Sequence, residues 1–449
     1  MSTYDDSHLL NIADQCLSRA AAEGADAADV ILGESLSVSS TVRLGAVEDV
    51  ERSEDVEMGL RVFVGQSQAI VSTSDFSEGS LQETAATAVA MAKAAPPDPH
   101  AGLPGETGGD AFVGDLDLFD EFAPSTDQLR EKAGEAEEAA LAVKGVSNSI
   151  GASASHGVTG VVLAASNGFS GAYRRSSHSL SCAVLAGEGT AMERDYEFSS
   201  KVHHSDLKSA KDVGATAGER TVKRLGGRKM PTQQVPVVYH PRVASQLLSN
   251  LASAISGSAI ARGTSFLKDK LGEPVFSDHI TIIDDPLLAR GSRSRPFDAE
   301  GQSSEVLKLI EAGQLTTWLL DFRTANQLEL KTNGRASRGI SSGPSPSSTN
   351  LYMEPGTLSV AELLSDIKQG FFVMGLMGRG GSVITGDYSE GANGFWIENG
   401  EIAHPVTEVT IAGNLADMYR ALTPADDLEF KGAVNAPTLR IEGMTVAGS

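Results

Sequence analysis

Cysteine is scarce in this chain, which has two in 449 residues, Cys16 and Cys182. They lie far apart and outside any Cys-x-x-Cys pair, which excludes a disulfide framework and fits a reducing compartment or small buried side chains. No apolar run approaches the roughly 18 residues that a membrane-spanning helix needs. The first residues, MSTYDDSHLL, are acidic and lack the basic and apolar regions of a signal peptide. We therefore expect a cytoplasmic protein without a membrane partner.

Positive charge is also in short supply. Lysine and arginine number 36 against 59 aspartate and glutamate residues, which gives a formal net charge of −23 and a pI of about 4.8. Such a surface repels the phosphates of nucleic acids and of anionic membranes. We therefore expect no nucleic-acid partner.

Histidines are few and scattered, so familiar metal-binding motifs are missing. The nine histidines include no His-Glu-x-x-His, no His-x-His and no cysteine–histidine cluster. The adjacent His203 and His204 would point in different directions in any regular element. One candidate remains, in which His279 forms a carboxylate–imidazole site with Asp284 and Asp285. The competing interpretation is that this Asp-Asp-Pro stretch is a turn.

Helical and alternating apolar patterns are both present, and they predict an α+β fold of mixed helices and mainly antiparallel sheets. A stretch rich in proline and glycine, residues 96–109, marks the clearest boundary. We accordingly divide the chain into an N-terminal domain (1–110), a middle domain (111–228) and a larger, β-rich C-terminal domain (229–449).

Individual elements follow from apolar spacing and from turn residues. Helices are predicted over residues 7–24, 80–95, 125–143, 206–225, 241–255 and 360–369. Strands are predicted within residues 30–74, 149–198 and 235–239. The acidic stretch 48–57 is expected to form an exposed turn or edge. Residues 394–401 read as a strand that ends in an Asn-Gly turn, with residues 402–410 returning as its partner.

A Gly-x-Ser-x-Gly pattern occurs at residues 339–343 and would make Ser341 a nucleophile. Asp387 and His404 follow it in the order that a hydrolase triad requires. The nucleophile elbow, however, needs a strand before the serine and a helix after it. A proline- and serine-rich run, residues 344–348, follows instead, so a serine-rich loop is the competing interpretation.

Glycines are concentrated in residues 378–401, too densely for a helix and with too many aromatic neighbours for a linker. Residues 378–381 could line an anion with backbone N–H groups, but no Gly-Lys-Ser/Thr and no helix follow. Turn glycines with one exposed arginine, Arg379, are the plainer interpretation. Phe395 and Trp396 would point to opposite faces of their strand, so we expect one of them in the core.

Several blocks, taken in order, resemble the TldD/PmbA family of peptidases, also described as modulators of DNA gyrase, and in particular its PmbA or TldE branch. They are residues 254–257 with 262–266, residues 334–335 with 349–356, and residues 385–389 with 396–400. The order and spacing of the blocks make the resemblance specific. It extends over essentially the whole chain.

In the catalytic TldD branch, the resemblance places a His-Glu-x-x-x-His motif on the helix before an Arg-Gly-Thr-Ser segment, with a cysteine near the C-terminus completing a zinc site. The equivalent positions in this chain are Leu248, Ser249 and Ser253. These side chains supply neither imidazole ligands nor a general base. No cysteine follows Cys182. The resemblance thus implies no catalytic residue, no metal and no cofactor in this chain, with zinc expected in a TldD-like partner.

The function that the resemblance implies is a non-catalytic subunit of a cytoplasmic metallopeptidase that acts on unfolded or small peptides, including peptide maturation. Its partner would be a TldD-like subunit, in a heterodimer or a larger complex, and the isolated chain could form a homodimer. Arg335, Asn350, Asp387 and Tyr388 are expected to line the substrate chamber or the interface. The competing interpretation is that these four residues hold turns together.

Two alternatives to this function stay open. The first is a self-sufficient hydrolase that uses either Ser341 or the site formed by His279 and Asp285. The second is a homo-oligomeric scaffold without peptidase function. Metal content and peptidase activity, measured with and without a TldD-like protein, distinguish the three interpretations.

Overall fold

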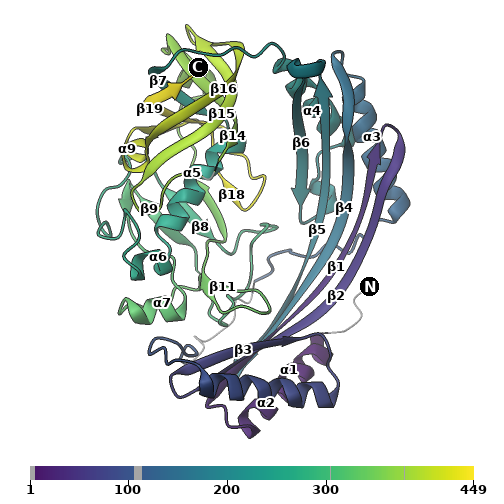
Figure 1. Cartoon of the computed structure of the whole chain (residues 1–449), viewed down its shortest axis with the longest axis vertical. Coiled ribbons are helices and arrows are strands. Elements are labelled where there is room, and N and C mark those ends of the chain that lie inside the picture. Colours follow the sequence, from purple (N-terminus) through teal and green to yellow (C-terminus); the bar gives the residue numbers. More distant parts are fainter. Residues whose placement is uncertain (1–5, 106–113, 304, 379, 449) are drawn as a thin grey trace.

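The computed structural model describes residues 6–105, 114–303, 305–378 and 380–448. Its helices and mainly antiparallel sheets confirm the predicted α+β class. Figure 1 shows a long curved sheet on one side of the molecule and a C-terminal domain with its own sheets on the other. The boundary predicted at residue 110 lies outside the described residues. Within the described ranges, no helix is long and apolar enough to cross a membrane.

The long sheet has six antiparallel strands in the order β3-β2-β1-β4-β5-β6. They are β1 (Ala27–Arg43), β2 (Ala46–Val64), β3 (Ser67–Thr73), β4 (Val146–Ala165), β5 (Ser170–Ala186) and β6 (Glu193–Lys201). Strand β1 pairs with β2 along one side and with β4 along the other. The segments predicted as N-terminal and middle domains therefore share one sheet.

Two pairs of helices cover this sheet, one at each end, and each pair has its own hydrophobic core. The first pair is α1 (Asp6–Ala22) with α2 (Glu78–Ala94), and the second is α3 (Thr126–Leu141) with α4 (Ala210–Lys223). Cys16 lies in the first core and Cys182 in the second. Burial raises the pKa of each thiol to about 12, so both cysteines are inert packing residues here.

The acidic stretch 48–57 is part of strand β2, and the turn predicted as one alternative lies instead at Leu44 and Gly45. Strand β3 pairs with residues 58–64 of β2 and leaves the preceding residues on the edge of the sheet. The side chains of residues 48–55 are exposed. Charged residues on a free edge discourage pairing with other chains, so the edge interpretation holds.

The C-terminal domain contains a second six-stranded sheet in the order β16-β15-β14-β7-β19-β17. Its strands are β7 (Gln233–Tyr239), β14 (Gln369–Met377), β15 (Asp387–Glu398), β16 (Glu401–Asn414), β17 (Leu422–Pro424) and β19 (Leu439–Ala447). Strands β7 and β14 are parallel, and the other pairs are antiparallel. Trp396 is buried in the domain's main core, as expected for one of the two aromatic residues on β15.

Shorter elements complete the C-terminal domain. A five-stranded sheet contains β8 (Ile282–Asp285), β9 (Leu307–Glu311), β10 (Gln314–Leu315), β13 (Asn350–Met353) and β18 (Val434–Asn435). A small hairpin joins β11 (Ala336–Ser337) and β12 (Ser345–Pro346). The helices are α5 (Pro241–Ala254), α6 (Gly257–Ala261), α7 (Phe322–Gln327), α8 (Val360–Leu364) and α9 (Leu415–Arg420). Short 3-10 turns lie at Gly189–Ala191 and His204–Asp206.

Local sequence signals predicted the glycine-rich hairpin well. Asn399 and Gly400 have φ values of 51° and 84°, as a two-residue turn between β15 and β16 requires. The helix predicted over residues 360–369 is wrong in its second half, because α8 ends at Leu364. Phe371 and Phe372 instead join β14, where they pair with β15 and β7.

Candidate functional site

Helix α5 stands between two cavities. The larger cavity, of about 740 Å³, separates α5 from the ends of β4, β5 and β6. The second, of about 660 Å³, lies along the other flank of α5 beside α6. Ser249 lines both cavities, and Ser253 lines the second. Two of the three positions that the sequence analysis aligned with the zinc motif, Ser249 and Ser253, therefore face cavities, whereas Leu248 lines neither of the two.

The side chains at these positions have no free ligand group. Leu248 is buried in the core of the C-terminal domain. The Ser249 hydroxyl donates to the carbonyl of Ser245 at 3.1 Å, and the Ser253 hydroxyl donates to the carbonyl of Ser249 at 2.9 Å. Throughout the described ranges, no group of three or more histidine, cysteine, aspartate or glutamate side chains is arranged to hold a metal ion. The site offers a hydroxyl-lined helix surface.

Arg242, in the first turn of α5, reaches across the larger cavity to the long sheet. Its guanidinium donates to Asp195 at 2.8 Å and lies over the ring of Tyr196, 4.4 Å from the ring centroid. Arg224 approaches the same carboxylate at 3.5 Å. A buried carboxylate shared by two arginines fixes both partners, so this contact sets the distance between α5 and β6.

A group of polar residues that the sequence analysis missed lies where α5 faces β15. Gln246 donates to Glu390 at 2.7 Å, and the second carboxylate oxygen of Glu390 has no hydrogen-bond partner among the described residues. The amide nitrogen of Asn250 is likewise buried without a described partner. Burial raises the pKa of Glu390. Gln246 and Asn250 form an i, i+4 pair of amide side chains on α5, which is the sequence signal that could have indicated this group.

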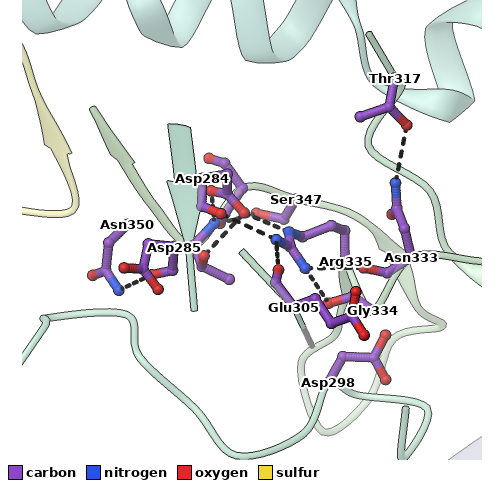
Figure 2. Close-up of polar contacts among 12 residues, drawn as sticks. Asp284, Asp285, Asp298, Glu305, Thr317, Asn333, Gly334, Arg335, Ser347 and Asn350 are labelled. Carbon is purple, nitrogen blue, oxygen red and sulfur yellow. Dashed lines mark hydrogen bonds and ion pairs between the residues drawn. The ribbon is translucent and has the colours of Figure 1, made fainter. Parts of the chain in front are cut away.

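Arg335 lies in the centre of a buried polar network (Figure 2). Its guanidinium forms an ion pair with Asp284, and both side chains are fully buried. Arg335 also donates to the carbonyls of Glu305 at 2.6 Å and Asn333 at 2.9 Å. Thr349 donates to the same aspartate through its backbone N–H at 2.6 Å and its hydroxyl at 3.0 Å. These bonds hold β8, β11 and the start of β13 together.

Asn350, the residue after Thr349, also links separate segments of the chain through buried hydrogen bonds. Its amide nitrogen donates to the carbonyl of Asp285 at 2.7 Å and to the Ser294 hydroxyl at 2.8 Å, and its oxygen accepts from the backbone N–H of Arg293 at 2.9 Å. Both Asn350 and Arg335 are buried. Their contacts are those of residues that hold turns together.

The remaining two predicted chamber residues differ from each other. Tyr388 is buried in the core, and burial raises the pKa of its hydroxyl strongly. Asp387 is exposed at the start of β15, where it accepts from the Thr385 hydroxyl at 2.7 Å and faces the Asn414 amide at 3.4 Å. Of the four predicted positions, only Asp387 reaches the surface of the chain.

The structure does not assemble the Ser341 triad. On β15, Asp387 pairs with Asn414 of β16. His404 lies on β16 ten residues before Asn414 and pairs with Trp396 of β15. At about 3.3 Å per residue, the aspartate and histidine lie roughly 30 Å apart. Ser341 itself lies in the turn between β11 and β12, which has no following helix. The nucleophile interpretation is wrong because its three parts lie in different places.

The loop that carries Ser341 docks the C-terminal domain onto the long sheet. Ile340 packs against Gly33 on β1 and against the backbone of Gly59 on β2. Arg338 forms a buried ion pair with Asp29, which Arg61 also contacts at 2.8 Å. Because Gly33 and Gly59 have no side chain, the loop can lie close against the backbone of the long sheet.

The proposed His279 site is not assembled either. The His279 side chain is half exposed and lies 3.7 Å from Asp278. Asp284 is buried in its ion pair with Arg335. The Asp285 carboxylate accepts a hydrogen bond from the backbone N–H of Leu287 at 2.8 Å. The competing turn interpretation is correct for this Asp-Asp-Pro stretch.

Histidines distant in sequence do meet at one place, on the face of the sheet near α3. His156 and His178 pair across β4 and β5, with ring centroids 4.7 Å apart, and His204 lies 5.6 Å from His178. His178 approaches Asp120 at 3.4 Å, yet neither of its ring nitrogens makes a hydrogen bond within the described part of the chain. Burial, reinforced by His156, lowers the pKa of His178 to about 4.

The anion loop predicted at residues 378–381 includes Arg379, which lies outside the described residues. Gly380 has a φ of 79° and packs closely against Asn250 and Gln246. Its positive φ is a conformation that favours glycine, so this residue fits the turn interpretation.

The chain shows similarity to known proteins over nearly its full length. Models of the PmbA/TldA metallopeptidase family match it in three parts: domain 1 over residues 28–92, the central domain over residues 119–225 and the C-terminal domain over residues 232–448. Metalloprotease PmbA of Escherichia coli O157:H7 is 38% identical over 425 residues, covering 94% of this chain and 92% of that protein. A PmbA homolog of Haemophilus influenzae is 36% identical, with the same coverage of 94% and 92%.

Solved structures show the same relationship. A Bacteroides thetaiotaomicron protein described as a candidate modulator of DNA gyrase superposes with a TM-score of 0.90, at 28% identity and 98% coverage of both chains. TldE of Thermococcus kodakarensis superposes with a TM-score of 0.84, covering 97% of this chain and 99% of that one. At 20% identity, the second comparison shows a shared fold alone.

Proposed function

This chain belongs to the PmbA/TldA metallopeptidase family, as its sequence blocks predicted, and we propose that it is the zinc-free subunit of a two-component peptidase. The complex acts in the cytoplasm on unfolded or small peptides. A TldD-like partner supplies the zinc ion and the general base. This chain supplies a wall of the peptide chamber and stabilises the partner.

The observation that supports this proposal is the surface of α5. The positions where the catalytic branch carries His-Glu-x-x-x-His hold Leu248, Ser249 and Ser253. The leucine is buried, and both hydroxyls donate to backbone carbonyls of the helix. Two imidazoles, a thiolate and a carboxylate are the groups that such a zinc site needs, and hydroxyls bound to the backbone replace none of them.

The cavities beside α5 support a role for this chain in holding the peptide substrate. Together they expose polar groups of α5, Arg242 and the free edge strand β6 to a volume that is large enough for a peptide segment. Exposed backbone at a sheet edge pairs readily with an extended chain. The retained role is therefore to hold substrate, with chemistry left to the partner.

The test is a reconstitution. We expect the purified chain to contain less than about 0.1 zinc per chain by mass spectrometry and to cleave no denatured protein or short peptide. Mixing it with a TldD-like protein that carries His-Glu-x-x-x-His should give a chelator-sensitive peptidase. The matched control is the same mixture with that glutamate replaced by glutamine in the partner, which should bind and remain inactive.

Two outcomes would overturn the proposal. Chelator-sensitive cleavage by the chain alone would show that it has a metal site of its own. Failure to associate with any TldD-like protein, together with a stable homo-oligomer in light scattering, would favour the scaffold interpretation. A homodimer that dissociates when the partner is added agrees with the proposal.

A further inference from the structure

A third cavity lies at the junction of the long sheet and the C-terminal domain. It has a volume of about 580 Å³ and is enclosed by the last turn of α4 and by strands β14, β15 and β16. It adjoins the larger α5 cavity, with which it shares Asp195, Arg224 and Met374. The only residue next to α5 that lines it is the N-cap, His240. Small-molecule pockets of proteins range from about 300 to 1,000 Å³.

The wall formed by the C-terminal domain is apolar. Its side chains are Phe372, Met374, Phe395, Ile402 and Pro405. Phe395 is the neighbour of the buried Trp396 and faces the other side of β15. Ile402 is 48% exposed although it lies in an apolar wall. Covering an apolar surface of this kind with an apolar ligand group removes it from water, which favours binding.

The opposite wall is cationic, and most of its charge is already matched. Arg220 forms an ion pair with Glu197. Arg224 contacts Glu193 at 3.1 Å and Asp195 at 3.5 Å. These carboxylates neutralise both arginines in place, so neither arginine demands a ligand.

Lys223 differs from its two neighbours. It lines the cavity, it is exposed, and within the part of the chain that the structure describes it makes no ion pair. Of the three cations that line this cavity, Arg220, Lys223 and Arg224, Lys223 is the one that no described carboxylate matches. One unmatched positive charge favours a ligand with one negative charge.

His240 adds a neutral hydrogen-bond donor. Its Nδ1 accepts from the backbone N–H of Arg242 at 3.2 Å, which places the proton of the neutral ring on Nε2. Burial and the neighbouring cations Arg220, Lys431 and Arg242 lower its pKa to about 3, so the ring is neutral at physiological pH. No hydrogen bond to Nε2 occurs among the described residues. This N–H is available to an oxygen atom in the cavity.

We propose that this cavity binds an apolar carboxylate, a ligand with one carboxylate group and a hydrophobic body. The carboxylate lies between the Lys223 ammonium group and the Nε2–H of His240, and the body covers Phe395 and Ile402. Two sources share this chemistry: a fatty acid, and the C-terminus of a peptide that ends in a large apolar residue. The proposal does not depend on where the zinc of the peptidase lies.

Calorimetric titration of the full chain tests the proposal. The probes are decanoate and the tripeptide Ala-Ala-Phe with a free carboxylate, and their neutral counterparts are decan-1-ol and the tripeptide amide. We expect one of the two acids to bind with a 1:1 stoichiometry and at least about fivefold more tightly than its neutral counterpart. The acid that binds identifies the source.

Two variants locate the site, and a third serves as the control. Lys223→Gln should weaken binding of the acid about fivefold and leave binding of the neutral counterpart unchanged. Ile402→Ala should weaken both by a similar factor, because apolar contact is lost. Lys211→Gln, an exposed lysine on the same helix outside the cavity, should bind like the parent.

Unfolding temperatures of the variants, measured alongside, show that each one is folded. The proposal is overturned if neither acid binds at about 1 mM. It is also overturned if Lys223→Gln and Lys211→Gln bind the acid equally well, or if the neutral compounds bind as tightly as the acids.

Discussion

The contact between Ile340 and the long sheet gives a sharp prediction for Gly59→Ala. A Cβ atom on Gly59 would lie 2.9 Å from the carbonyl carbon of Ile340 and closer still to its oxygen. The obstacle is backbone, so no rotamer change relieves it. Either the docking loop, residues 338–343, must move away, or β2 must bend.

The expected cost follows from what the loop would lose. Overpacking of a close contact costs about 1–3 kcal/mol. Withdrawal of the loop would expose Ile340 and weaken the Arg338 ion pair with Asp29, each worth about 1.5–3 kcal/mol. Alanine in a strand recovers about 0.5–1 kcal/mol relative to glycine. We expect a net loss of about 1–3 kcal/mol, or roughly 5 °C for a cooperative unit of about 200 residues.

Trypsin provides the local assay, because the Arg338 side chain is 2% exposed in the docked loop. Gly59→Ala should unfold at a lower temperature and should be cleaved after Arg338, as identified by mass spectrometry. Gly160→Ala is the matched control on β4 of the same sheet, since its Cβ would meet neighbours no closer than 3.4 Å. If Gly59→Ala matches that control in both stability and cleavage, the proposed docking contact is refuted.

Three further outcomes follow from buried charge. Arg335→Met leaves Asp284 without its counterion in a fully buried site and should reduce the free energy of unfolding by about 3–5 kcal/mol in denaturant titrations; a loss below about 1 kcal/mol would contradict the network. The folded pKa of His178, about 4, lies below its ordinary value of 6.5, so the stability it contributes above pH 6.5 is lost as the pH falls toward 4. His178→Phe should therefore reduce the acid sensitivity of the unfolding temperature between pH 6.5 and 4, and an unchanged pH profile would refute this. Burial and the nearby Asp298 raise the pKa of Glu300 to about 8, so stability is lost as the pH rises toward 8, and Glu300→Gln should stabilise the protein more at pH 9 than at pH 5.

Elements governed by nearby residues were predictable from the sequence. Helices α1, α2, α3 and α5 follow from apolar spacing, and the start of α3 also follows from Ser125, which caps it. The β15–β16 hairpin follows from its Asn-Gly turn, because that dipeptide readily adopts the required positive φ values. The family was predictable for the same reason, since its blocks are contiguous in the chain.

Features governed by distant pairing were not predictable. Strands β1 and β4 are separated by about 100 residues, and no local signal shows that they share a sheet. Glu390 reaches Gln246 only because β15 and α5 pack together, and His156 meets His178 only through strand register. Arg335 and Asn350 were expected on a chamber wall because they occur in family blocks, yet a polar residue in such a block can equally hold a turn from inside.

The shared sheet has a mechanical consequence. Strands β1 and β4 run unbroken from the core that contains Cys16 to the core that contains Cys182, a span of roughly 50 Å at about 3.3 Å per residue. The C-terminal domain contacts the long sheet near one end through Ile340, which packs on β1 and β2, and near the other end through Arg242, which binds Asp195 on β6. Because the long sheet is held at two distant points, it resists bending between them, so the cavity between the sheet and α5 keeps a constant width.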